Sequence, residues 1–394
     1  MAKLIDITGK CISGEWGLDD NDGTGIPVLR TTNFTNDGIV NFSNVVTRQI
    51  NKKNLSDKYL KQGDIIIEKS GGSDNQPVGR VIYFDGQKNT YLFNNFTGLL
   101  RVADQTTWLP KYVFYALFAN YQNGGTKSFE NKTTGLHNLK TDSYVQSVDI
   151  KELSYEDQKH IVTFLDKITH LIFLRKQQLS KLDELVKARF VELFGDPVVN
   201  EKGWDTKPLL EMGSCKNGMN FHYEDTGVEI NCLGVGDFKD YSIILDTAIL
   251  PTVSLNEMPS ADYMLQDDDI VFVRSNGNKA LVGRSVAVYP GDIPTTFSGF
   301  CIRYRKTDEA VNIPYLLRVL KAESVRQKMA GRGANIQNLN QQILGTLIIP
   351  VPPIELQNQF AAFVEQTYKS KLSIQQSLEK LETLKKALMQ KYFG

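Results

Sequence analysis

Residues 156–194 carry a seam of mostly apolar positions whose steps alternate between four and three residues. A matching but more polar seam runs through the C-terminal stretch. This alternation is the spacing of a coiled-coil contact. The first stretch has 39 residues, which at about 1.5 Å per residue make a helix of roughly 58 Å, longer than a small domain is wide. We therefore expect two long helices that project and pair antiparallel, with an amphipathic helix lying on its own domain as the alternative. The seam positions are Ile161, Leu165, Ile168, Ile172, Arg175, Leu179, Leu182, Val186, Arg189 and Leu193, then Phe360, Val364, Thr367, Lys371, Ile374, Leu378, Leu381, Lys385, Leu388 and Tyr392.

Outside these seams the chain alternates between short β-branched runs and helical stretches. The runs "DIIIE", "RVIYF", "DIVFV" and "RSVAVY" are separated by Gly, Asn and Asp, which predicts strands joined by turns. The stretches "LPKYVFYALFANYQ" and "IPYLLRVLKAESVRQKMA" are typical of helices. This mixture indicates an α+β fold class.

The chain also repeats itself. "GDIIIEKSGGS" (63–73) matches "DDIVFVRSNGN" (268–278), and other markers follow in the same order at a nearly constant offset. A period this long indicates two copies of a whole domain with its helix, a pseudo-two-fold duplication. We expect one domain in 1–150, the first long helix and a linker in 151–197, a second domain in 198–350 and the second long helix in 351–394.

Composition places few further limits on the chain. It is 41% hydrophobic and 23% charged, as in an ordinary soluble protein. It lacks a run of about 20 apolar residues and a signal-peptide core, so we expect no membrane association and a cytoplasmic location. The four cysteines form no CxxC pair, which favours reduced thiols over a zinc site. The net charge is zero, so binding to DNA would need local basic clusters or the help of a partner.

Two homologous domains held apart by paired helices would suit a target with two separated half-sites. Duplex DNA is the commonest such target. The residues that complete this picture are "LKQGDIIIEKSGG" with its echo, "LSYEDQKHIVTFLD" with "IPVPPIELQNQFAAFV", and "KLDELVKARFVELFGDP" leading to "GW". In these motifs the whole chain resembles the specificity subunits of type I restriction–modification systems.

The resemblance implies two target-recognition domains that each read one half of a bipartite site in double-stranded DNA. It further implies that two methyltransferase subunits dock on the helices and that restriction subunits join the complex. S-adenosylmethionine would then belong to the methyltransferase, and ATP with Mg to the restriction subunits, with no cofactor in this chain. Basic residues of the helices are candidates for that docking, namely Lys167, Arg175, Lys176, Lys181, Lys187, Lys380, Lys385 and Lys386.

Catalytic motifs are missing from the sequence. Amino methylation needs an Asn-Pro-Pro-aromatic or Asp-Pro-Pro-aromatic motif and an extruded base, whereas the single Pro-Pro pair here follows Val351. "GNKALVGRS" (277–285) has five residues between its glycines and no P-loop lysine. We therefore expect a non-catalytic recognition subunit. A self-sufficient DNA methyltransferase or nuclease and a coiled-coil scaffold that binds proteins remain the alternatives.

The first repeat suggests where DNA would be contacted. Its two copies share a basic residue, Lys69 or Arg274, and a small polar loop, but Glu68 is replaced by Val273, which favours a binding loop over a metal site. Arg80 and Arg284 recur in "VGR" and equally fit structural ion pairs, while His137 fits a satisfied packing residue. "GRGAN" (331–335) carries the most weight, because its glycines allow close approach to a duplex. The candidate DNA contacts are Arg30, Thr31, Thr32, Asn33, Lys69, Ser70, Ser73, Asn75, Gln76, Lys127, Lys132 and Thr133 in the first copy, and Arg274, Ser275, Asn276, Asn278, Lys279, Arg332, Asn335 and Gln337 in the second.

Overall fold

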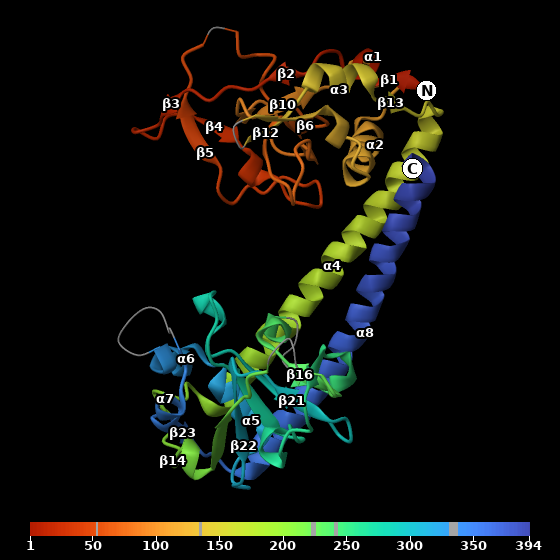
Figure 1. The fold of residues 1–394 in the computed structure, drawn as a ribbon. Coiled ribbons are helices and arrows are strands. Elements are labelled where there is room, and N and C mark those ends of the chain that lie inside the picture. Colours follow the sequence, from red (N-terminus) through yellow and green to blue (C-terminus); the bar gives the residue numbers. More distant parts are fainter. Residues whose placement is uncertain (53, 134–135, 222–225, 240–242, 331–337) are drawn as a thin grey trace. The chain divides into compact units, whose positions relative to one another are not determined.

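Two compact units make up the chain (Figure 1). The computed structural model describes residues 1–52, 54–133, 136–221, 226–239, 243–330 and 338–394. Unit 1 comprises Met1–Lys176 and Gln376–Gly394, and unit 2 comprises Gln177–Gln375. Two helices of 40 residues each, α4 (Tyr155–Phe194) and α8 (Ile354–Phe393), give part of their length to each unit.

Unit 1 is built around a four-stranded antiparallel sheet of order β2-β10-β6-β8. A second sheet has the order β3-β5-β4-β9, with β4 and β9 parallel, and a third has the order β11-β12-β7. A short pair, β1 with β13, joins the two ends of this domain. The strands are β1 (Ala2–Lys3), β2 (Ile12–Ser13), β3 (Leu18–Asp19), β4 (Ile26–Leu29), β5 (Val46–Gln49), β6 (Ile65–Glu68), β7 (Ser70–Gly72), β8 (Val81–Tyr83), β9 (Leu92–Phe93), β10 (Thr97–Leu100), β11 (Glu130–Thr133), β12 (Leu136–Leu139) and β13 (Asp149–Ile150).

The central strand β6 separates two apolar clusters in unit 1. Its side chains alternate between the two faces of the sheet, as the pleat requires. Ile65 and Ile67 face a cluster that includes Tyr112 of helix α2, whereas Ile66 faces a cluster that includes Phe84. The helices of the unit are α1 (Leu4–Thr8), α2 (Pro110–Gln122) and α3 (Thr141–Ser147), with the short 3-10 helices η1 (Thr31–Asn33) and η2 (Lys127–Phe129).

Unit 2 repeats this plan with a five-stranded sheet of order β15-β22-β19-β20-β17. Its central strand β19 likewise sends Ile270 and Phe272 to one cluster and Val271 and Val273 to another. The strands are β14 (Thr206–Pro208), β15 (Gly213–Asn217), β16 (Val228–Leu233), β17 (Ile243–Ile244), β18 (Thr252–Leu255), β19 (Asp269–Val273), β20 (Ser285–Val288), β21 (Thr295–Phe297), β22 (Cys301–Lys306) and β23 (Ile348–Pro350). The helices are α5 (Ile313–Leu320), α6 (Glu323–Ala330) and α7 (Gln341–Gly345), and the 3-10 helices are η3 (Leu209–Glu211), η4 (Val235–Lys239), η5 (Thr247–Ile249), η6 (Ala261–Tyr263) and η7 (Lys279–Leu281).

The duplication extends to individual buried contacts. Asp64 pairs with Arg101 at 2.7 Å in unit 1, and Asp269 pairs with Arg305 at 2.7 Å in unit 2. Both carboxylates sit at the start of the central strand of their unit and are almost completely buried. Because the same buried ion pair recurs at the same place in the fold, the two units are homologous in structure as well as in sequence.

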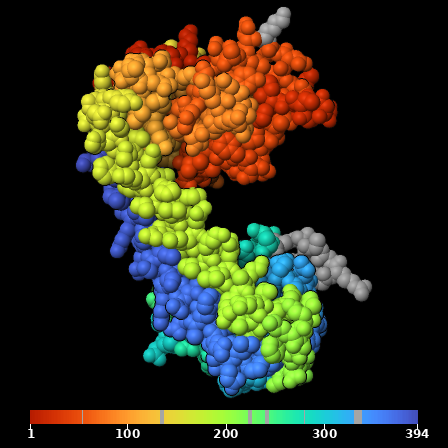
Figure 2. Space-filling model, turned by 180° about the vertical axis from the view of Figure 1, so that it is seen from behind, coloured from red at the N-terminus to blue at the C-terminus, as the bar shows by residue number. Residues whose placement is uncertain are grey.

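The long helices pack antiparallel within each unit (Figure 1 and Figure 2). In unit 1, Arg175 of α4 donates to Ser377 of α8 at 3.2 Å, and in unit 2 Lys371 of α8 pairs with Asp183 of α4 at 2.7 Å. The seam also packs on a domain, which was the alternative to helix pairing, since Leu165 of α4 belongs to the core of unit 1. In each unit, the long helices therefore contact both one another and the domain of that unit.

Candidate nucleic-acid interface

Three segments that carry the predicted DNA contacts of unit 1 lie together. Strand β7, which begins at Ser70, pairs with β12, and β12 pairs with β11. The backbone N–H of Leu139 donates to the carbonyl of Lys69 at 2.8 Å. Arg80 then links this group to the loop at η1, because its Nη2 donates to the carbonyl of Thr31 at 3.3 Å. The fold thus assembles residues from about 30, 70 and 130 into one polar surface.

Unit 2 repeats one of these backbone contacts. The N–H of Leu339 donates to the carbonyl of Arg274 at 2.8 Å, as Leu139 does to Lys69. Arg326 of α6 holds the following turn by donating to the carbonyl of Val282 at 3.3 Å. The recurring contact makes the Lys69 loop of unit 1 and the Arg274 loop of unit 2 equivalent in the fold.

Most of the predicted contacts of unit 1 reach its surface, but Asn33 does not. Asn33 is 2% exposed; its Oδ1 accepts from the N–H of Arg30 and its Nδ2 donates to the carbonyl of Asn41, both at 2.9 Å. It therefore shapes the loop that presents its neighbours. Of the remaining candidates Thr32, Ser73, Asn75 and Lys127 are exposed, Arg30, Thr31, Lys69, Ser70 and Gln76 are half-buried, and Lys132 and Thr133 lie in β11.

The predicted contacts of unit 2 sit on a loop that their own side chains organise. Asn276 accepts from the N–H of Asn278 at 2.7 Å, and Asn278 accepts from the N–H of Ala280 at 3.1 Å. Arg274, Ser275 and Asn276 are half-buried, Asn278 is exposed, and Lys279 begins η7. Arg332, Asn335 and Gln337, which include the most heavily weighted candidates, lie outside the described residues.

The sequence left open whether Arg80 contacts DNA or forms a structural ion pair, and its contact with Glu68 decides for the ion pair. Arg80 donates to both carboxylate oxygens at 2.9 Å, from Nε and from Nη2. Glu68 is 1% exposed, and its hydrogen bonds raise the pKa of the Arg80 guanidinium. Arg80 is therefore an ion-pair arginine. The signal in the sequence is an acidic residue at the end of a buried strand, followed by "VGR".

His137 lies in β12 and is 8% exposed. Its ring contacts the carboxylate of Glu130 and lies 3.7 Å from that of Asp74. The structure thus bears out the prediction of a packing residue with satisfied polar atoms.

Other polar groups of the described residues give no sign of a reactive centre. Within the described part of the chain, no three His, Cys, Asp or Glu side chains are grouped so as to hold a metal. The four cysteines are free, and burial raises the pKa of Cys11, Cys215 and Cys232 to about 12. Such thiols stay protonated at neutral pH and are poor nucleophiles. None of the helices traced in the described ranges has an apolar stretch that would cross a bilayer.

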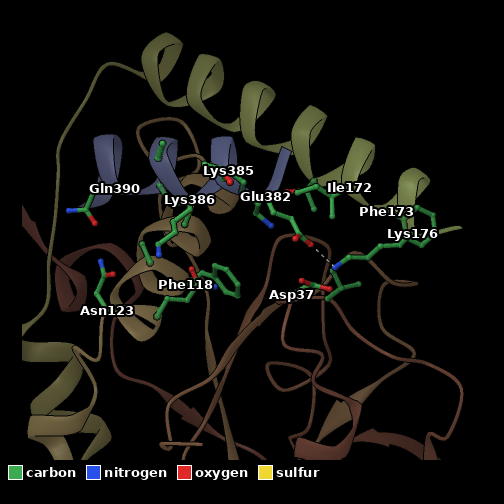
Figure 3. A pocket seen from close by; sticks show the side chains of 17 residues that line it. Asp37, Phe118, Asn123, Ile172, Phe173, Lys176, Glu382, Lys385, Lys386 and Gln390 are labelled. Atoms are coloured by element: carbon green, nitrogen blue, oxygen red, sulfur yellow. Dashed lines mark ion pairs between the residues drawn. The ribbon is translucent and has the colours of Figure 1, made fainter. Parts of the chain in front are cut away.

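A pocket of about 820 Å³ lies in unit 1 between α2 and the two long helices (Figure 3). Its wall is largely apolar, with Phe118 and Ile172 among the lining residues. An ion pair between Lys176 and Glu382 at 3.3 Å lies at its side. Lys385 places its Nζ 5.9 Å from the centre of the Phe118 ring, and burial lowers the pKa of this lysine. The apolar wall suits an apolar group, and the lysines at its rim suit an acidic one.

Comparison with known proteins decides between these interpretations. The family model described as "Type I restriction modification DNA specificity domain" matches residues 1–184 and again residues 202–385. The chain belongs to this family. The duplication seen in sequence and fold is thus a pair of specificity domains, and the predicted α+β fold class with two homologous domains and two long helices is confirmed.

Individual specificity subunits support the assignment. The chain is 25% identical over 395 residues to the type I restriction enzyme StySPI specificity subunit of Salmonella potsdam, covering 93% of this chain and 81% of that one. It is 32% identical over 137 residues to the putative type I restriction enzyme MjaX specificity subunit of Methanocaldococcus jannaschii, a match that covers 34% of this chain and 32% of that one. The solved S subunit from M. genitalium shares the fold with a TM-score of 0.60 at 16% identity, over 100% of this chain and 95% of that one.

The assignment also settles the class of function. A specificity subunit is a DNA-recognition subunit without catalytic activity of its own, so the prediction of a non-catalytic recognition subunit is confirmed. The comparisons give no support to a self-sufficient methyltransferase or nuclease, nor to a protein-binding scaffold.

Proposed function

We propose that this specificity subunit directs a type I restriction–modification complex to a bipartite site in double-stranded DNA, and that each specificity domain reads one half-site. The supporting observation is the polar surface of unit 1, together with the backbone contact that recurs at the corresponding loop of unit 2, made by Leu139 and Leu339. The exposed side chains of this surface and loop, such as Ser73 and Asn278, are of the types that reach base edges, while the lysines nearby are of the type that contacts phosphates. The reading domains are 1–150 and 198–350.

The two helical segments, 151–197 and 351–394, have a different role in this proposal. Each long helix contributes to both units, so its length is suited to setting the spacer between the half-sites. Large apolar side chains remain exposed on α4, including Phe164 at 57% and Leu171 at 42%. Exposed apolar groups of this size indicate a protein contact. We assign that contact to two methyltransferase subunits.

The chemistry of the complex lies in its partners. The methyltransferase subunits bind S-adenosylmethionine, and restriction subunits bring ATP and Mg for translocation and cleavage. The complex acts on cellular DNA, which in a prokaryote is in the cytoplasm. The absence of strong net charge in this chain fits a complex in which the partners supply part of the phosphate contacts.

A domain exchange tests the two-reader proposal. Residues 1–150 are replaced by the corresponding domain of a relative with a different target, the chimera is expressed with the methyltransferase, and the methylated motif is read by long-read sequencing. The proposal predicts that one half of the motif changes while the other half and the spacer stay the same. A motif changed in both halves, or in neither, would contradict it.

A further inference from the structure

The two "VGR" turns place an arginine at the same position in each unit. Gly79 and Gly283 have φ angles of 106° and 77°, in the left-handed region that favours glycine. After the turn, the carbonyl of Arg80 accepts from the N–H of Glu68 at 2.8 Å, and the carbonyl of Arg284 accepts from the N–H of Val273 at 2.9 Å. The backbone therefore aligns Arg80 with Arg284 and Glu68 with Val273.

The charge of Arg80 is cancelled inside unit 1. Its side chain is 15% exposed and makes the two-pronged contact with the buried Glu68 carboxylate. A planar guanidinium held by both carboxylate oxygens is the strongest geometry for such a pair. Nη2 also donates to the carbonyl of Thr31 at 3.3 Å, and the guanidinium carbon lies 5.7 Å from the centre of the Phe34 ring. Arg80 is thus held by a carboxylate, a backbone carbonyl and an aromatic ring of its own unit.

The charge of Arg284 is not neutralised by a carboxylate of the described residues. The residue that would cancel it is Val273, which is 0% exposed and belongs to an apolar cluster. Within the described ranges, neither a carboxylate nor another acceptor bonds to the side chain of Arg284, which is half-exposed. Burial and then the charge of Arg284 lower the pKa of Arg326, so two arginines repel each other at this place.

This uncompensated arginine adjoins the loop of predicted DNA contacts. That loop starts at Arg274, directly after β19, and leads through η7 to Arg284, whose N–H donates to the carbonyl of Leu281 at 3.0 Å. Arg326 braces the same stretch through the carbonyls of Ala280 and Val282 at 3.5 and 3.3 Å. A positive charge beside such a loop matches a phosphate, for which arginine has the suitable fork of donors. We propose that Arg284 binds a backbone phosphate of the DNA. In unit 1 the ion pair with Glu68 prevents Arg80 from making the equivalent contact. This inference rests on the proposed function and assigns unequal phosphate binding to its two reading domains.

The test exchanges the residue that differs between the units. In the intact complex with its methyltransferase, Val273→Glu supplies Arg284 with the carboxylate that Arg80 has, and Val273→Gln is the matched control of the same shape without charge. Arg284→Gln removes the charge directly. Glu68→Gln does the converse in unit 1, since it keeps the side-chain shape and uncovers the charge of Arg80. Dissociation constants for target and unrelated duplexes are measured from 50 to 200 mM salt, with thermal unfolding as the check on folding.

Each phosphate contact contributes about 0.9 to the slope of log affinity against log salt. We expect Arg284→Gln and Val273→Glu each to make the slope shallower by about 0.9, and the two together to do no more than either alone. Glu68→Gln should steepen it by up to about 0.9, and Val273→Gln should leave it unchanged. Wild-type slopes in folded Arg284→Gln and Val273→Glu would overturn the inference while leaving the proposed function intact. If the wild-type complex itself does not prefer its target, the proposed function fails instead.

Discussion

Gln158 supports the junction between the first domain and helix α4. It is 0% exposed and makes three hydrogen bonds to the backbone. Its Oε1 accepts from the N–H of Leu109 at 2.9 Å, and its Nε2 donates to the carbonyls of Thr107 and Leu153 at 2.9 and 3.0 Å. Gln357 makes the equivalent three contacts in unit 2. One side chain therefore ties the start of α2 to the start of α4.

Replacing Gln158 by Met keeps the length of the side chain and removes all three bonds. Each hydrogen bond contributes about 1 kcal/mol net, and each buried backbone group left unpaired costs about 1–3 kcal/mol. We therefore expect Gln158→Met to lower the free energy of unfolding of unit 1 by about 4 kcal/mol. With a slope of about 2 kcal/mol per molar urea, the midpoint falls by about 2 M.

The chain allows unit 1 to be observed by itself. Two of its three tryptophans, Trp16 and Trp108, are in unit 1 and the third, Trp204, is in unit 2. In a Trp204→Phe background, fluorescence during urea unfolding reports on unit 1. Gln87→Met, at an exposed loop position, is the control and should leave the midpoint in place. A loss below about 1 kcal/mol for Gln158→Met would refute the reasoning, since one net hydrogen bond would account for it.

Three further outcomes are expected. Asp64→Asn and Asp269→Asn each leave a half-buried arginine without its buried carboxylate, so each should destabilise its own unit by about 3–5 kcal/mol. The urea assay follows Asp64→Asn in the Trp204→Phe background and Asp269→Asn through Trp204 in a Trp16→Phe/Trp108→Phe background; unchanged midpoints would show the pairs to be dispensable. The thiols of Cys11, Cys215 and Cys232, whose pKa values are raised to about 12, should react slowly with a thiol reagent at pH 8 until urea is added, and buried Cys232 most slowly. Because these pKa values are raised, the stabilisation they reflect is complete below the unfolded value near 9 and disappears as pH rises toward 12. Lys127→Ala should weaken binding to target and unrelated duplexes alike and flatten the salt slope by about 0.9; a loss confined to the target would mean that it reads a base.

Elements with strong local patterns were predictable from the sequence. The runs "DIIIE" and "DIVFV" are the central strands β6 and β19, and the heptad seam at 156–194 is α4 within one residue. In each case the pattern reflects burial of a single face or seam, which a local window of sequence records. The prediction was less accurate for 313–330. The sequence indicates one helical stretch there, whereas the structure has two helices, α5 and α6.

Short strands and side-chain roles were beyond local patterns. Strand β16 pairs in parallel with β21, more than sixty positions later, and the register of this pair cannot be derived from a window of sequence. The same holds for the site: the loop of Asn33 was found, but its burial depends on Asn41 and the turn around it. Glu68 and Arg80 are twelve positions apart, and only the fold shows that they meet.

Target selection by the two specificity domains is tested most directly by long-read methylation sequencing of DNA from cells that express this chain with and without its methyltransferase. We expect one split motif, modified only when both proteins are present, with two half-sites separated by a spacer of fixed length. A continuous motif, or a motif produced by the methyltransferase without this chain, would contradict the claim that its two specificity domains select the target.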